Sequence, residues 1–173
     1  MNTLLYTSAY DTRFGKSLVA SRIGISEQAN TFEPKTNIYE DVNDIIAERT
    51  NNNISNCAPG NIHCVFIDEA QFLTKEQVKQ LCQIVDELNI PVLTYGLRSD
   101  FLGEPFEGSK YLLIYADELI EVKTICFCGK KAIMNAKFDA NNKIVRTGDQ
   151  IDIGGNEKYI SLCRKHFNEG RLK

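Results

Sequence analysis

The chain has 173 residues, of which 43% are hydrophobic and 25% are charged, and its formal net charge is -3. These values are typical of one globular domain, with or without a small appendage, and they exclude disorder, collagen-like repeats and coiled coil as the main architecture. The apolar runs are far shorter than the roughly 20 residues that cross a membrane, and no signal peptide is recognisable. The mildly acidic balance argues against nucleic-acid binding. We therefore expect a cytoplasmic protein that binds neither membranes nor nucleic acid.

The first half of the chain alternates between strand and helix patterns. Residues 4–9 are apolar and β-prone, and residues 40–48 place apolar side chains at helical spacing. Residues 62–67 form an apolar run of strand length that ends in two acidic residues. These patterns predict a strand, an amphipathic helix and a second strand.

The next elements extend this alternation. Thr74, followed three residues later by Gln77, has the pattern of a capping box at the start of a helix. Residues 91–95 are again apolar and end at Gly96. A strand, a helix and a strand with short connections predict a βαβ unit in a parallel sheet, where functional groups collect at the carboxyl ends of the strands.

The adjacent acids Asp68 and Glu69 stand at such a strand end. This is the Walker B arrangement, in which one carboxylate supports Mg2+ and the other acts as a base, although a solvated loop is an equally simple interpretation. Gly15, Lys16 and Ser17 look like part of a phosphate-binding loop, but the first glycine of that motif is replaced by Tyr10. We therefore reject these residues as a Walker A motif.

Three of the six cysteines form a pattern with one of the two histidines. Cys126 and Cys128 make one close pair, and Cys163 and His166 make a second pair a few tens of residues later. Two such pairs build a closed, structural zinc site, while the alternative is that they are ordinary strand and surface residues. Around them, residues 132–138 and 143–147 are predicted to form a hairpin.

Four segments together resemble one enzyme family. They are residues 66–72 (FIDEAQF), 95–103 (YGLRSDFLG), 124–132 (TICFCGKKA) and 153–166, which begins with IGGNEKY and ends with CRKH. Their order and length are similar to those of the bacterial members of the type II, or cytosolic, thymidine kinases. The resemblance implies an α/β fold: a P-loop-kinase-like parallel sheet with helices over residues 1–117, and a small zinc-ribbon β subdomain carrying a lasso loop over residues 118–173.

The resemblance also implies roles around ATP. Glu69 is implied as the general base that takes the proton from the thymidine 5'-hydroxyl, and Asp68 as the residue that supports Mg2+, usually through water. The ATP site is implied to be bordered by Asp68, Glu69, Ala70 and Gln71, with Arg13 holding phosphate charge.

Further implied roles concern thymidine, zinc and assembly. Phe101 is implied to pack against the thymine base, and the lasso is implied to hold thymidine through Gly154, Gly155 and Tyr159. The zinc ligands implied are the four residues of the cysteine and histidine pairs: Cys126, Cys128, Cys163 and His166. The family forms tetramers, so a homo-oligomer is expected.

One departure from the family concerns the phosphates. In the family a strand, a phosphate-binding loop and a helix precede an Asp-x-Arg segment. Here that segment begins at Asp11, so the resemblance implies that the given sequence lacks this strand, loop and helix. The main hypothesis is an ATP-dependent thymidine kinase that acts in DNA precursor salvage, with low activity expected of this exact chain. The alternative is an inactive or split-gene remnant that binds nucleoside and zinc without phosphoryl transfer. A zinc-ribbon interaction module is the least favoured hypothesis.

Overall fold

The computed structural model describes residues 2–11, 15, 17–21, 23–51, 62–151 and 158–173. These residues fall into two compact units. The first unit comprises Met1–Leu97 and Glu107–Tyr115, and the second comprises Arg98–Phe106 and Ala116–Lys173. The second unit thus includes residues 98–106, a segment that the predicted division after residue 117 assigns to the first.

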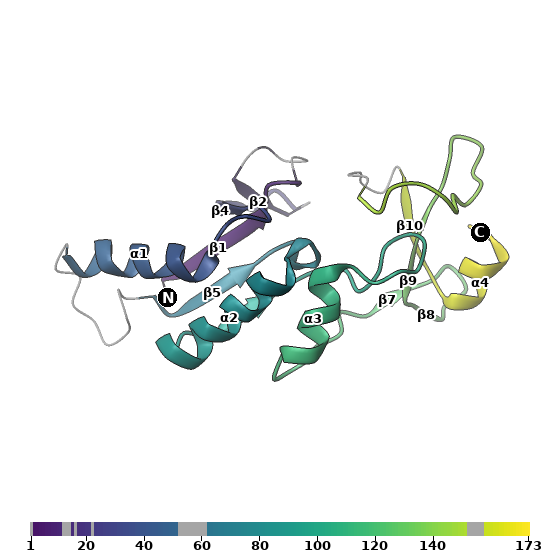
Figure 1. Ribbon diagram of the computed structural model, residues 1–173. Helices are drawn as coiled ribbons and strands as arrows, with labels where there is room; N and C mark the ends of the chain where they lie inside the picture. The colour runs from purple at the N-terminus through teal and green to yellow at the C-terminus, as the bar shows by residue number, and fades with distance from the viewer. Residues whose placement is uncertain (1, 12–14, 16, 22, 52–61, 152–157) are drawn as a thin grey trace. The chain divides into compact units, whose positions relative to one another are not determined.

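The first unit is built on a four-stranded parallel sheet (Figure 1). Its strand order is β4 (Asn30–Phe32), β1 (Thr3–Ser8), β5 (Cys64–Ile67) and β6 (Val92–Thr94). The helices are α1 (Ile38–Asn51), α2 (Lys75–Leu88) and α3 (Glu107–Tyr115), and a 3-10 helix, η2 (Ala70–Phe72), follows β5. The predicted mixed α/β class with a parallel sheet is therefore confirmed.

The core of the first unit lies on one face of this sheet. Leu4 and Tyr6 of β1 and Val65 and Ile67 of β5 are buried together with side chains of α1 and α2. Side chains alternate between the two faces of a strand, so Phe66 and its register partners Leu5 and Leu93 point the other way. Leu93 is 40% exposed. The helices therefore cover the face that carries the fully buried residues.

The start of α2 is fixed by local sequence. The Thr74 hydroxyl accepts a hydrogen bond from the Gln77 backbone N–H at 3.2 Å, and the Gln77 side chain accepts one from the Thr74 N–H at 3.0 Å. This is the predicted capping box. The Gln77 amide also donates to the carbonyls of Glu33 and Thr36 at 2.7 and 3.0 Å, so the cap also attaches α2 to the segment before α1.

The segment rejected as a Walker A motif leads into a strand. β2 (Leu18–Ala20) pairs antiparallel with β3 (Ser26–Gln28). A phosphate-binding loop leads into a helix whose N-terminal N–H groups face the phosphates. A strand directly after Ser17 is incompatible with that arrangement, which agrees with the rejection. Lys16 lies outside the described residues.

The second unit has short antiparallel pairs and one short helix. β7 (Thr124–Ile125) pairs with β8 (Lys131–Ala132), β9 (Met134–Lys137) pairs with β10 (Tyr159–Leu162), and α4 (Arg164–Glu169) follows. The predicted hairpin of residues 132–138 and 143–147 is reduced to a turn with one bridge, between Phe138 and Ile144. The strand that β9 pairs with is β10, which the sequence patterns did not reveal.

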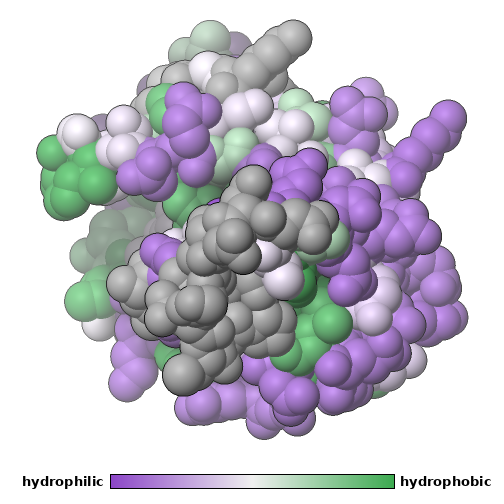
Figure 2. Space-filling view, turned by 90° about the vertical axis from the view of Figure 1, so that its left-hand side faces the viewer, coloured by the Kyte–Doolittle hydropathy of each residue, from purple (hydrophilic) through white to green (hydrophobic). Residues whose placement is uncertain are grey.

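The surface is consistent with the composition. In the coloured part of Figure 2, hydrophilic side chains are more extensive than apolar ones, which appear as separate patches. None of the helices in the described part of the chain is long and apolar enough to span a membrane.

Candidate functional site

The acidic pair lies at the carboxyl end of β5, where the backbone makes a tight turn. Asp68 N–H donates to the Tyr6 carbonyl at 2.8 Å, and Ala70 N–H donates to the Tyr95 carbonyl at 2.8 Å. Between them Glu69 adopts the left-handed conformation, with φ 52° and ψ 38°. Both acidic residues are half-buried. The turn is thus attached to β1 on one side and to the end of β6 on the other.

The side chain of Gln71 holds the Glu69 carboxylate. Gln71 is only 2% exposed, and its Nε2 donates to Glu69 Oε2 at 2.5 Å. Its Oε1 accepts the backbone N–H of Leu97 at 3.1 Å. The resemblance placed Gln71 and Ala70 at the ATP site, and that role stays a prediction. Sequence reasoning missed the contact with Glu69, because no local pattern shows which way a glutamine after two acids points.

Phe101 lies inside the second unit. It is 2% exposed, and the ammonium group of Lys137 sits 4.9 Å from its ring centroid. A Cβ atom at Gly148 would lie 3.7 Å from Phe101 Cζ. Phe101 therefore packs beneath β9 and the start of the predicted lasso, and its contact with a thymine base stays a prediction.

Buried Asp100 connects the Phe101 turn to the lasso segment. Its Oδ1 accepts the N–H groups of Leu102 and Glu104 at 2.8 and 2.9 Å, and its Oδ2 accepts from Gln150 Nε2 at 2.9 Å. This carboxylate satisfies the turn backbone and also restrains Gln150. No sequence pattern indicates the contact between Asp100 and Gln150, because these residues lie 50 positions apart.

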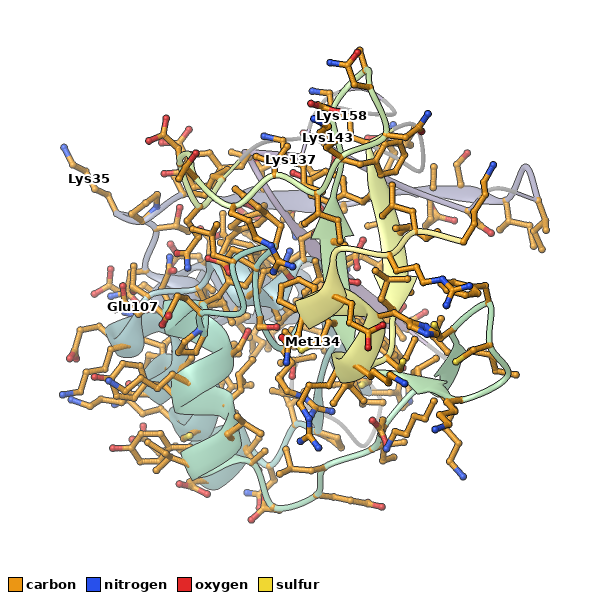
Figure 3. The ribbon with its side chains drawn as sticks, turned by 90° about the vertical axis from the view of Figure 1, so that its right-hand side faces the viewer. Lys35, Glu107, Met134, Lys137, Lys143 and Lys158 are labelled. Carbon is orange, nitrogen blue, oxygen red and sulfur yellow. The ribbon has the colours of Figure 1, made fainter. Side chains whose placement is uncertain are left out.

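Tyr159 begins β10 and pairs with Lys137 of β9. The Lys158 carbonyl accepts the N–H of Phe138 at 2.9 Å. Figure 3 shows Lys137, Lys143 and Lys158 gathered at one end of this strand pair, and the carboxylate of Asp139 lies in the same turn as Lys143. The other predicted site residues, Arg13, Gly154 and Gly155, lie outside the described residues.

The four predicted metal ligands come together in the second unit. Their ligand atoms all lie within 4.8 Å of one another: Cys126, Cys128, Cys163 and His166. Cys126 Sγ is 3.4 Å from His166 Nδ1, and Cys128 Sγ is 4.0 Å from Cys163 Sγ. Ligands about 2.3 Å from a tetrahedral ion lie roughly 3.8 Å apart. The cluster therefore fits a four-coordinate metal ion such as zinc.

Two turns present these ligands. In the first, Cys126 N–H donates to the Lys130 carbonyl at 2.8 Å, and Gly129, at φ 80°, donates to the Cys126 carbonyl at 2.9 Å. In the second, Cys163 precedes α4, which carries His166 on its first turn. The His166 ring stacks on Phe127 with centroids 4.4 Å apart. This contact restrains the orientation of the imidazole ring.

The environment of Cys126 favours the thiolate that a metal requires. Burial acts to raise the pKa of this thiol, but hydrogen bonds from the backbone of Cys128 and Cys163 and from the His166 ring outweigh it and lower the pKa to about 6. A thiolate is the form of cysteine that binds metal. The effect is specific to Cys126. At Cys128 the hydrogen bond from the Lys130 backbone lowers the pKa, but burial and the Cys126 and Cys163 thiols outweigh it, and the pKa is raised.

These features define a class of protein. A central strand of a parallel sheet ends in two acidic residues, one held by a buried amide, and a separate unit carries a Cys3His cluster. The protein is thus an α/β protein with an acidic site at a strand end and a unit that can bind a metal ion.

Comparison with known proteins identifies the family. The family model for thymidine kinase matches residues 1–167. The thymidine kinase of Mannheimia succiniciproducens is 52% identical over 169 residues, which covers 98% of this chain and 81% of the relative. That of Shewanella oneidensis is 53% identical over 169 residues, covering 98% and 82%. The chain belongs to the thymidine kinase family and is a kinase, which confirms the resemblance seen in the sequence.

Proposed function

We propose that this kinase transfers the γ-phosphoryl group of ATP to the 5'-hydroxyl of thymidine. The observation that carries the proposal is the acidic turn, where Glu69 follows β5 directly and is held by Gln71. Phosphoryl transfer requires a positioned acceptor for the proton of the attacking hydroxyl. The relatives that match 98% of this chain bear the name thymidine kinase.

In the proposed reaction, the thymidine 5'-oxygen forms a bond to the γ-phosphorus while the bond between that phosphorus and the bridging oxygen of ADP breaks. The hydroxyl proton passes to the carboxylate of Glu69, and the electron pair of the broken bond leaves with ADP. Mg2+, which accompanies ATP, supplies charge neutralisation at the phosphates, and Asp68 is the residue proposed to hold it.

Thymidine is proposed to bind in the second unit. Phe101, Tyr159 and the lasso that begins near Gly148 are the elements proposed to contact it. The support is that Asp100 holds the Phe101 turn and Gln150 together through hydrogen bonds. The zinc ion proposed for the Cys3His cluster has four protein ligands and no open position, so its role is structural. The four ligand residues follow β7, follow β10 and lie on α4, so a bound ion would join these elements, and β10 comes directly after the predicted lasso in the sequence.

The decisive test of this function compares two carboxylate substitutions. In thymidine phosphorylation assays with ATP and Mg2+, Glu69→Gln is expected to lower kcat by about 10²–10⁴-fold, since this is the contribution of a general base. Glu76→Gln, which removes an exposed carboxylate that pairs with Lys79 on α2, is the matched control and should leave kcat unchanged. Equal activity in the Glu69→Gln variant would refute the assigned role.

The alternative of binding without transfer is tested in the same preparation. Family membership favours a working kinase. Saturable thymidine binding by calorimetry, combined with no phosphorylated product at any ATP concentration, would instead support the alternative. The homotetramer and the cytoplasmic location stay predictions; sedimentation and cell fractionation test them.

A further inference from the structure

We propose that Gln71 is a positioning residue that fixes the orientation of the Glu69 carboxylate for proton transfer. This inference rests on the proposed function, since it assigns a partner to the proposed general base. It is carried by contacts within the first unit: a buried amide, a left-handed backbone conformation at Glu69, and two glycines that enclose the turn.

The orientation of the Gln71 amide is decided by its surroundings. A glutamine side chain has one acceptor oxygen and one donor nitrogen, so its orientation follows from the groups that face its two ends. Here one end of the amide faces the backbone N–H of Leu97 at 3.1 Å, and a backbone N–H can only donate. That end must be Oε1, so Nε2 faces the Glu69 carboxylate and donates to it. The assignment is thus forced by the Leu97 contact.

The backbone at Glu69 is held in one conformation, so the direction in which its side chain leaves the turn is fixed. The N–H groups on either side, of Asp68 and Ala70, are bonded to Tyr6 and Tyr95, and the Glu69 carbonyl accepts the N–H of Phe72 at 3.1 Å. With φ at 52°, Glu69 lies in the left-handed region of backbone conformations, which residues with a Cβ atom rarely adopt. Such a conformation persists when its surroundings impose it, and it is often found at functional sites.

Two glycines enclose the Gln71 side chain and the turn that carries it. A Cβ atom at Gly96 would lie 2.7 Å from Gln71 Oε1 and 2.9 Å from its backbone nitrogen. A Cβ atom at Gly108, on α3, would lie 2.4 Å from the Ala70 carbonyl oxygen. Any side chain at either position would push on the turn. Because neither glycine has a Cβ atom, the segment after β6 and the start of α3 pack directly against the turn. Gln71 is thereby packed in one orientation.

The hydrogen bond makes the two carboxylate oxygens of Glu69 chemically different. A hydrogen bond from the amide makes Oε2 the less basic oxygen, so the proton from the 5'-hydroxyl is expected on Oε1. The amide cannot take the proton itself, because it is neutral and already donates. Gln71 therefore acts through Glu69 and sets where its proton-accepting oxygen lies, and a misplaced reacting group is costly to the rate.

The test substitutes Gln71 and uses a second buried glutamine as control. Gln71→Met keeps the size of the side chain and removes the amide; it is expected to lower kcat by about 10–100-fold with the KM for thymidine nearly unchanged. Gln77→Met removes an equally buried amide. This amide caps α2, and its hydrogen bonds are to Glu33, Thr36 and Thr74 rather than to the acidic pair. It should lower thermal stability and leave kcat unchanged.

A charge substitution separates positioning from packing. Gln71→Glu places a second carboxylate against Glu69, and like charges disfavour ionisation of the base. The acid limb of the pH–rate profile should therefore move to higher pH, while the profile of Gln77→Glu should match that of the unsubstituted protein. If both Gln71 variants lose stability but keep the kcat and pH profile of the parent, the role is structural and the proposal is wrong.

A readout without turnover keeps this proposal distinct from the proposed function. In 15N-labelled protein, the side-chain NH2 signal that disappears in Gln71→Met identifies Gln71, and Gln77→Met identifies the control signal. Glu69→Ala should shift the Gln71 signal and speed its hydrogen exchange, with the Gln77 signal unmoved. An unchanged Gln71 signal would contradict the proposal that Gln71 positions the Glu69 carboxylate, even if the enzyme is active. A shifted signal in a protein that never phosphorylates thymidine would instead count against the function alone.

Discussion

The two units hold their functional side chains by different means. In the first unit, backbone hydrogen bonds and one buried amide fix the acidic turn over a core that spans β1, β5, α1 and α2. In the second, four soft ligands converge from two turns over a much smaller buried cluster. A site held by hydrogen bonds is complete without a ligand, whereas a site built from metal ligands gains its folding energy when the ion binds. We therefore expect the first unit to be stable alone and the second to depend on metal.

The largest expected effect is the loss of metal from the second unit. Metal analysis of purified protein should find about one zinc ion per chain, and Cys128→Ser should abolish it. Structural zinc contributes about 10–16 kcal/mol in small zinc domains, so removal of the ion should unfold the second unit while signals of the first persist. The measurement is metal content together with 15N NMR spectra. Cys82→Ser, a thiol on α2, is the control and should retain the ion.

A folded second unit in metal-free protein would contradict the expectation that this unit depends on metal. It would mean that the buried residues around Ala136, Leu162 and Phe167 suffice as a core without an ion.

The second effect concerns the apolar core of the first unit. Ile84 on α2 is fully buried, and Ile84→Ala should lower the free energy of unfolding by about 2–5 kcal/mol in urea titrations, because it leaves a cavity. Gln83→Ala, at an exposed neighbouring position, should have little effect. Zinc content should be unchanged in both. A loss of zinc in Ile84→Ala would show that the two units do not unfold independently.

The smallest expected effect is at the start of α2. Thr74→Ala removes the side chain that caps this helix and should cost about 1 kcal/mol of stability, measured by thermal or urea unfolding. Thr74→Ser keeps the hydroxyl and should restore most of it. If Thr74→Ala and Thr74→Ser have equal stability, the capping hydrogen bond contributes nothing measurable.

The features that sequence predicted best are those set by neighbouring residues. Thr74 and Gln77 form a reciprocal cap three residues apart, and such a contact needs only the local helix. Strands β5 and β6 follow from short apolar runs with a helix between them. The Cys3His cluster was predictable for a different reason: thiolate and imidazole ligands are rare enough that their paired spacing is informative by itself.

The features that sequence missed depend on contacts between distant segments. The side chain of Gln71 is hydrogen-bonded to Leu97, 26 residues later in the chain, and Asp100 is hydrogen-bonded to Gln150, 50 residues later. The main partner of β9 is β10, and the predicted hairpin is reduced to one bridge, because strand pairing depends on how the whole unit packs. The residues next to Gln71 in the sequence do not show whether its amide faces solvent or is hydrogen-bonded to a carboxylate.

The sequence by itself determined the family, the parallel α/β class, the acidic pair and the metal ligands, because each of these is a matter of residue type and spacing. The tertiary structure alone decided that Glu69 adopts a left-handed conformation and that Gln71 holds its carboxylate. It also decided that Gly96 and Gly108 lie so close to the acidic turn that a Cβ atom at either position would clash with it. The physical reason is that a side chain's orientation is fixed by hydrogen-bond partners and excluded volume, and both come from segments far away in the chain.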